Sequence, residues 1–102
     1  MEPVRGHLDA LLLAILADGP AHGYGVIEEL KRRSDGVFAL PEGTVYPALH
    51  RLEHDGLLAS SWQAGSPRPR RVYRLTRKGR RALDARRRQW ERFSGAVDAV
   101  LA

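Results

Sequence analysis

The stretch from Pro41 to Leu58, PEGTVYPALHRLEHDGLL, decides the fold. Three of its apolar residues have the i, i+4, i+7 spacing of one helical face: Val45, Leu49 and Leu52. Gly56 follows as a stop signal. Pro47 lies inside this pattern, and proline is tolerated in the first turn of a helix, where the N–H groups have no intrahelical partner. The helix is therefore predicted to begin near residues 42 to 44, with Thr44, Tyr46 and Pro47 clustered at its N-terminal end.

Two helices are predicted before this stretch. The run LDALLLAILA, residues 8–17, is apolar on more than one side, so it predicts a helix that is buried nearly all round and ends at Gly19-Pro20. A second helix is predicted from about Gly23 to Ser34, before the stop signal Asp35-Gly36. Its inward residues are Val26, Ile27 and Leu30.

A hairpin is predicted after Gly56. The segments LLASSWQA and RRVYRLT have the composition of short strands. Their connection, GSPRPR, contains one glycine and two prolines and is too long for a tight turn. We therefore expect a projecting loop that carries Arg68, Arg70 and Arg71.

The last segment predicts a long amphipathic helix, capped by Thr76 and running to about Leu101. Its apolar residues recur at seven-residue intervals on two tracks. A helix of about 25 residues extends about 37 Å, longer than the small domain ahead of it can cover. We expect a second chain to cover the stripe in a homodimer, with help from the first helix; the alternative is a helix folded back over its own core. The predicted dimerisation residues are Leu8, Leu12, Leu83, Trp90, Phe93, Val97 and Leu101.

Length and composition agree with one small unit. The 102 residues suffice for a single domain whose core is marginal without a partner, divided here into residues 1–75 and a C-terminal dimerisation helix at 76–102. The absence of cysteine excludes disulfides and thiolate metal sites and fits a cytoplasmic protein. The longest apolar run, about ten residues, is far short of the ~20 that cross a bilayer. No export signal is recognised.

Charge is distributed unevenly along the chain. Residues 66–92 contain twelve Arg or Lys and two acidic residues, whereas the remainder contains five basic and ten acidic residues, within a total net charge of +5. A chain polarised in this way is typical of proteins that bind nucleic acid. The alternative is a solvated run of charges.

Three helices, a two-stranded hairpin and a basic loop amount to a winged helix-turn-helix, here followed by one long helix in a mainly α fold. HGYGVIEEL, GTVYPALHRLEHDGLL and RRVYRLTRKGRRAL resemble the PadR family of bacterial transcriptional regulators over about residues 8–101. The single C-terminal helix resembles the compact branch of that family. The resemblance implies a dimeric repressor that binds a pseudo-palindromic operator and, as in many members, responds to small aromatic or phenolic compounds.

The helix of the opening stretch is the predicted recognition helix. Its polar side fits the major groove of B-DNA, and its N-terminal residues lie closest to bases and phosphates. Thr44 and Tyr46 can donate hydrogen bonds to phosphate oxygens beside the free N–H groups of the first turn. Pro47 offers a flat apolar contact, and Arg51 reaches either guanine or phosphate. For Tyr46 the alternative is packing under the helix.

The loop arginines are predicted to reach the adjacent minor groove or the DNA backbone. Lys78, with Arg77, is expected to add backbone contacts. Tyr24 lies near the start of the second helix and suits either a phosphate contact or the core. The full set of predicted DNA-binding residues is Tyr24, Thr44, Tyr46, Pro47, His50, Arg51, Arg68, Arg70, Arg71 and Lys78.

One motif suggests a different chemistry. The segment His50–His54 matches H-x-x-E-H, the inverted zinc-peptidase signature. A catalytic zinc needs a third protein ligand and a cleft, which the remaining histidines do not convincingly supply, and Glu53 also suits a surface salt bridge. With no glycine-rich phosphate loop and no G-x-S-x-G, we predict no enzyme, metal or cofactor. The rival function is a winged-helix module that binds an acidic protein without reading an operator.

Trp90 and Phe93 raise the question of an effector. On facing helices of a dimer they would line a cavity able to stack a planar aromatic compound, and plain interface packing is the alternative. The sequence leaves open the operator, the regulated genes and the existence of an effector.

Overall fold

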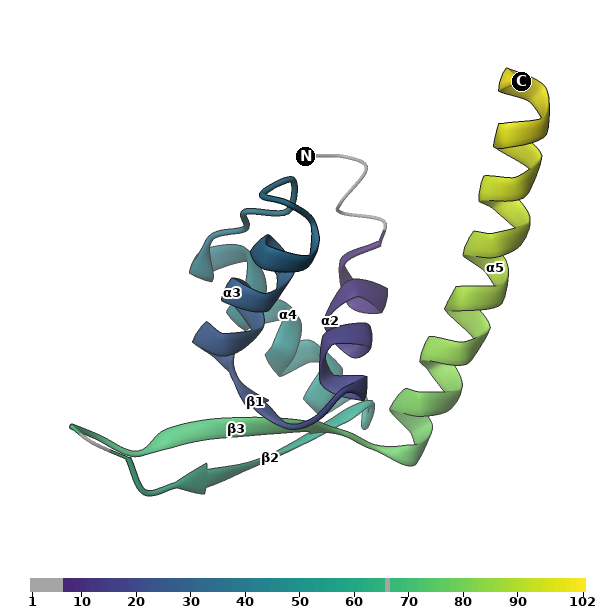
Figure 1. Ribbon diagram of the computed structural model, residues 1–102. Helices are drawn as coiled ribbons and strands as arrows, with labels where there is room; N and C mark the ends of the chain where they lie inside the picture. The colour runs from purple at the N-terminus through teal and green to yellow at the C-terminus, as the bar shows by residue number, and fades with distance from the viewer. Residues whose placement is uncertain (1–6, 66) are drawn as a thin grey trace.

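The computed structural model describes residues 7–65 and 67–102. Figure 1 shows three helices above a small sheet, with a long helix rising from one end of it. The elements are α2 (Leu8–Ala17), β1 (Ala21–His22), α3 (Gly23–Arg33), α4 (Glu42–His54), β2 (Leu58–Gln63), β3 (Arg70–Leu75) and α5 (Arg77–Leu101). This mainly helical winged helix-turn-helix is the predicted fold class. Residues 1–6 of the predicted first unit lie outside the described residues.

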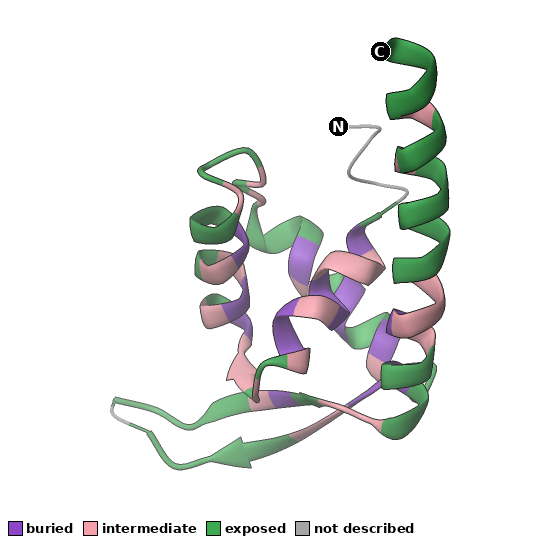
Figure 2. Cartoon of the chain, turned by 45° about the vertical axis from the view of Figure 1, so that its right-hand side comes forward, coloured by how far each residue is buried: buried purple, intermediate pink, exposed green. Residues whose placement is uncertain are grey.

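The core fills the space between α2, α3 and α4 and the start of α5 (Figure 2). Helix α2 is at its centre, because its leucines are buried on more than one side, as predicted. Helix α3 contributes Val26 and Leu30. Helix α4 contributes the predicted face, with Val45, Leu49 and Leu52 almost inaccessible to solvent.

Local signals set the ends of the helices. The side chain of His22 caps α3 by accepting a hydrogen bond from the Gly25 N–H at 3.1 Å. After α3, Asp35 and Gly36 have φ values of 55° and 84°, the left-handed conformation in which glycine is favoured. The predicted last residue of this helix, Ser34, is its C-cap.

Pro47 lies one turn deeper in α4 than predicted. The helix begins at Glu42, the early limit of the expected range, so Pro47 is its sixth residue and belongs to the second turn. The missing N–H would have donated to the carbonyl of Gly43. Gly43 is exposed, so water can satisfy that carbonyl. This explains how the helix tolerates a proline at this position.

The sheet has three antiparallel strands in the order β1-β3-β2. The predicted hairpin is present, with Ser60 opposite Tyr73 and Trp62 opposite Arg71. Strand β1 was not predicted, because two residues carry no alternating pattern. It pairs Ala21 with Tyr73 and so ties the start of α3 to the hairpin.

Helix α5 has the predicted cap and length: the Thr76 hydroxyl accepts from the Gly79 N–H, and the helix ends at Leu101. One part of the predicted dimer surface is wrong. Leu8, Leu12 and Leu83 are buried within the single chain, so their side chains belong to its own core. Within residues 7–65 and 67–102, no helix combines the length and the hydropathy needed to cross a membrane.

Candidate nucleic-acid interface and apolar pocket

The side of α4 opposite the core is exposed. It carries a hydroxyl, a proline ring and two imidazoles on successive turns: Thr44, Pro47, His50 and His54. Because the apolar side of α4 is fully buried, the helix cannot rotate to hide these groups. They form the polar face that the sequence predicted, and it remains free to contact a partner.

Tyr46 lies between α3 and α4. A Cβ atom placed on Gly23 would lie 2.3 Å from Cε1 of Tyr46, so the tyrosine ring occupies the space that glycine leaves open. Burial raises the pKa of Tyr46, with a smaller effect from the charge of Glu42. The ring of Tyr46 is therefore packed against α3, which is the alternative that the sequence left open for this residue.

Tyr24 is exposed in the first turn of α3, with 56% of its surface accessible. A hydrogen bond with Glu28 and the charge of that carboxylate raise the pKa of Tyr24, and Glu42 adds to the effect. The effect of Glu42 links the phenol electrostatically to the first residue of α4. The sequence allowed Tyr24 either a phosphate contact or a place in the core, and the exposure of its side chain excludes the core.

The wing is the hairpin segment 61–75 with its connecting loop. Its two most distal arginines, Arg68 and Arg70, are exposed. Nη1 of Arg70 lies 3.0 Å from Nε2 of His22, the cap of α3. Arg70 of the wing therefore lies beside the start of α3, which packs against Tyr46 in α4.

Three of the predicted DNA-binding cations are engaged within the chain. Arg51 pairs with Asp9 of α2. Arg71 forms an ion pair with Glu53 of α4, Nη2 to Oε1 3.2 Å. The ammonium group of Lys78 donates to the carbonyl of Asp55 at 2.8 Å. Lys78 thus lies at the C-terminal end of α4, where it caps the helix, and its predicted contact with the DNA backbone stays a prediction.

The ion pair between Arg71 and Glu53 gives the glutamate of the H-x-x-E-H segment a structural role. Glu53 forms the surface salt bridge that the sequence allowed for it. Among the residues that the structure describes, no three His, Cys, Asp or Glu side chains gather in a metal-binding arrangement.

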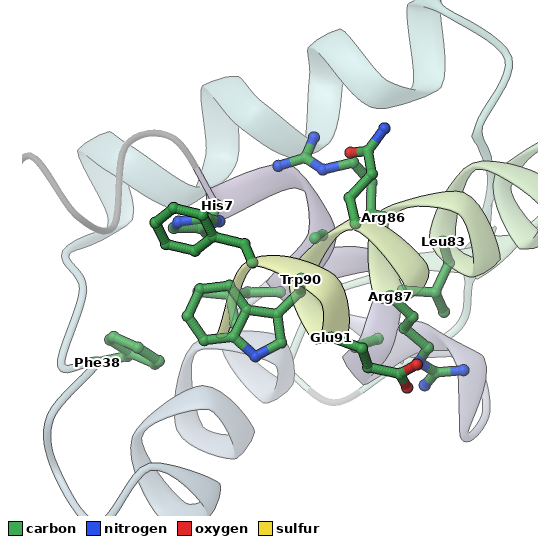
Figure 3. Close-up of a pocket in the computed structure, with 12 residues that line it drawn as sticks. His7, Phe38, Leu83, Arg86, Arg87, Trp90 and Glu91 are labelled. Atoms are coloured by element: carbon green, nitrogen blue, oxygen red, sulfur yellow. The ribbon is translucent and has the colours of Figure 1, made fainter. Parts of the chain in front are cut away.

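An apolar pocket of about 690 Å³ lies between α2 and α5 (Figure 3). Trp90 lies 5.2 Å from His7, ring centre to ring centre, in an edge-on arrangement, and 6.1 Å from Phe93. Phe38, from the loop after α3, lies across the pocket from Trp90 in Figure 3. The sequence predicted Trp90 and Phe93 in a cavity between facing helices of a dimer, whereas this pocket lies within one chain. His7 and Phe38, which also line it, were not predicted because they carry no spacing signal.

Beyond this pocket, none of the other described helices or strands lies against α5, as Figure 2 shows. Its exposed large apolar residues are Trp90, Phe93, Val100 and Leu101, and Val97 between them is half-buried. Such an apolar stripe on a projecting helix is unusual for a monomer.

Sequence reasoning missed the partners of Arg71. Every second residue of β2 lies on the same face of the strand, and this face carries Leu58, Ser60 and Trp62. The alternating pattern of LASSWQ would therefore have placed Ser60 and Trp62 side by side. No local signal links them to Glu53 of α4.

Comparison with known proteins agrees with this architecture. Residues 12–85 match the model of the "Transcriptional regulator PadR-like family". The transcriptional regulator Rv3488 of Mycobacterium tuberculosis is 44% identical over 81 residues, covering 79% of this chain and 73% of that protein. A PadR family regulator from Eggerthella lenta has a similar structure, with a TM-score of 0.84, 38% identity and coverage of 98% of this chain and 86% of that one. A regulator from Clostridium thermocellum gives a TM-score of 0.88 at 26% identity, with 96% of each chain covered. The chain therefore belongs to the PadR-like family of transcriptional regulators.

Proposed function

We propose that this chain is a cytoplasmic, homodimeric repressor of adjacent genes that binds a pseudo-palindromic DNA operator. In this proposal α4 enters the major groove, and the wing follows the backbone into the neighbouring minor groove. Residues 76–102 serve as the dimerisation helix. The observation that supports the proposal is the exposed polar face of α4 together with an exposed wing arginine, Arg70, that lies beside the start of α3, the helix that packs against Tyr46 of α4.

The proposed DNA contacts follow from exposure. Thr44 and Tyr24 donate to phosphate oxygens, and Pro47 and His50 face the base edges. Arg68 and Arg70 reach the backbone or the minor groove. Arg51 contributes once it exchanges Asp9 for DNA, which costs little because ion pairs between half-exposed side chains contribute ~1 kcal/mol or less.

The proposed dimer follows from the uncovered stripe on α5. Trp90 and Phe93 are 52% and 60% exposed, and Leu101 is 78% exposed. Burying an aromatic side chain of this size in a partner interface is favourable by ~25 cal/mol for each Å² of apolar surface. Self-association of two stripes also sets two copies of α4 in two-fold symmetry, which a palindromic operator requires.

Selection of binding sites from a random DNA pool tests this proposal. The purified protein is expected to enrich two inverted half-sites whose centres lie about one helical turn, ~34 Å, or a multiple of it apart. Its mass in solution is expected to be twice that of the protomer. A protein that enriches no sequence yet binds acidic proteins would support the rival interaction module, and a stable monomer would contradict the dimer.

We also propose that a small planar aromatic compound releases the repressor by binding at Trp90 and Phe93. The pocket volume of about 690 Å³ lies within the usual range for small-molecule sites. Its walls combine aromatic rings with the polar groups of His7 and Glu91. Such a ligand weakens operator binding only by preferring a dimer in which the two copies of α4 no longer match the half-sites.

Tryptophan fluorescence provides the test of this effector site. In a Trp62→Phe background, Trp90 is the only tryptophan, so quenching reports on the pocket. Phenolic and planar compounds are expected to quench it and to weaken operator binding over the same concentration range. A Trp90→Leu variant serves as the control that should lose the response of operator binding. A screen that changes neither signal would remove the proposed effector.

A further inference from the structure

Four side chains join the recognition helix to the wing; we call them the helix–wing clamp: Glu53 of α4, Ser60 and Trp62 of β2, and Arg71 of β3. Nε of Arg71 donates to the Ser60 hydroxyl at 2.8 Å, and Nη2 donates to Oε1 of Glu53 at 3.2 Å. The Ser60 hydroxyl donates to the other oxygen of Glu53. The guanidinium lies over the ring of Trp62, 5.6 Å from its centre. Arg71 is thus held from three sides.

Among residues 7–65 and 67–102, the neighbouring arginine, Arg70, has no set of partners comparable to that of Arg71. His22 Nδ1 accepts the Gly25 N–H, so in the neutral ring the proton is on Nε2. Nη1 of Arg70 lies 3.0 Å from Nε2 of the same ring, which can accept from Arg70 only in the tautomer that gives up the bond to Gly25. Arg70 therefore gives up at most this one contact when it turns to a phosphate, whereas Arg71 would have to give up two hydrogen bonds.

The clamp lies where the hairpin leaves the body of the protein. Ser60 pairs with Tyr73, which is buried, and one step outward Trp62 pairs with Arg71. Beyond that step, the described residues from Gln63 to Arg70 are all exposed, so no core contact orients them. The angle of the wing relative to α4 is therefore set at the clamp.

We propose that Arg71 is a positioning residue, which acts through Glu53 to hold the wing at the angle needed for Arg68 and Arg70 to reach DNA while α4 occupies the major groove. This inference rests on the proposed operator binding. Without the clamp, the wing must be ordered at the moment of binding, and ordering side chains and loops at an interface lowers affinity.

The first test uses a substitution for which a positioning role and simple electrostatics predict opposite changes in DNA affinity. Glu53→Gln removes a negative charge from a DNA-binding surface, so charge alone would strengthen binding to the selected operator. Loss of the clamp is expected to weaken it, on the order of tenfold. Glu29→Gln is the matched control, because Glu29 also forms ion pairs with arginine, here Arg32 and Arg33, but on the surface of α3, away from the wing. It is expected to leave affinity unchanged.

The second test separates positioning from a direct phosphate contact at Arg71. Arg71→Lys keeps the positive charge but cannot span Ser60 and Glu53 with a planar fork. It is expected to weaken binding as much as Arg71→Ala, and the double variant E53Q/R71K is expected to be no weaker than either single variant. Hydroxyl-radical footprints should lose protection of the backbone at the outer minor grooves, and methylation of guanine N7 should remain protected in the major groove. Thermal melting of each variant checks that the fold is intact.

The outcomes distinguish this inference from the function on which it rests. Unchanged or tighter binding by Glu53→Gln, or wild-type affinity in Arg71→Lys, would overturn the positioning role and leave operator binding standing. Failure of the wild-type protein to select any DNA would overturn both proposals.

Discussion

Raising the salt concentration from about 50 to about 200 mM is expected to weaken operator binding by about 10³ to 10⁵. This range corresponds to six to ten phosphate contacts in a dimer, each of which releases a condensed counterion when it forms. The two wings are expected to supply a large share, because Arg68 and Arg70 are exposed near the outer end of the hairpin. Fluorescence anisotropy of labelled operator across a salt series measures the slope of log affinity against log salt.

The double variant R68A/R70A removes four of these charges from a dimer. Its slope is expected to be smaller by about 4, with weaker binding at low salt. R80A/R81A makes the same change in net charge at the start of α5, at the opposite end of the sheet from the wing tip (Figure 1). That control is expected to keep the wild-type slope. Equal slopes for the two double variants would show that the wing does not contact phosphates.

Gly79→Ala is expected to lower the free energy of unfolding by about 3 kcal/mol and the melting temperature by about 12 to 24 °C. A Cβ atom at this position would lie 2.1 Å from the carbonyl oxygen of Leu57 and 2.7 Å from Leu75. The oxygen cannot move freely, since it accepts the Thr76 N–H at 3.2 Å. The extra methyl group therefore forces apart the junction between α4, the sheet and α5.

Gly95→Ala in the same helix is the matched control. A Cβ at Gly95 meets no atom within 4 Å, and by helical spacing the residue lies on the side of α5 opposite Trp90 and Val97. This substitution is expected to raise the free energy of unfolding by about 1 kcal/mol, because alanine is the better helix former. Both variants are melted at one protein concentration, since dimerisation makes stability concentration-dependent. A Gly79→Ala protein as stable as wild type would contradict the packing described at this junction.

The sequence by itself determined the helices, the hairpin and the exposed face of α4. Helical spacing of apolar residues is a local property, and the core positions Val45, Leu49 and Leu52 follow from it alone. The same holds for the end of α3 at Asp35-Gly36 and for the Thr76 cap of α5. The polar face of α4 could be predicted too, because it is the side of the helix left exposed once the apolar face is buried.

Only the tertiary structure decided which charged side chains are free. Arg51 and Asp9 are 42 residues apart, and Arg71 and Glu53 are 18 apart, so no local pattern reveals either pair. In sequence Arg70 and Arg71 look equivalent; strand pleating turns one toward the His22 ring and the other toward Glu53.

The tertiary structure also decided how much of the apolar stripe on α5 is buried. Leu83 and Trp90 occupy one seven-residue track, yet Leu83 is 1% exposed and Trp90 52% exposed. The cause is the small size of the helical layer, which covers the first turns of α5 and ends before the later ones. Periodicity identifies an apolar face, but the dimensions of the packed domain determine how much of that face it can bury.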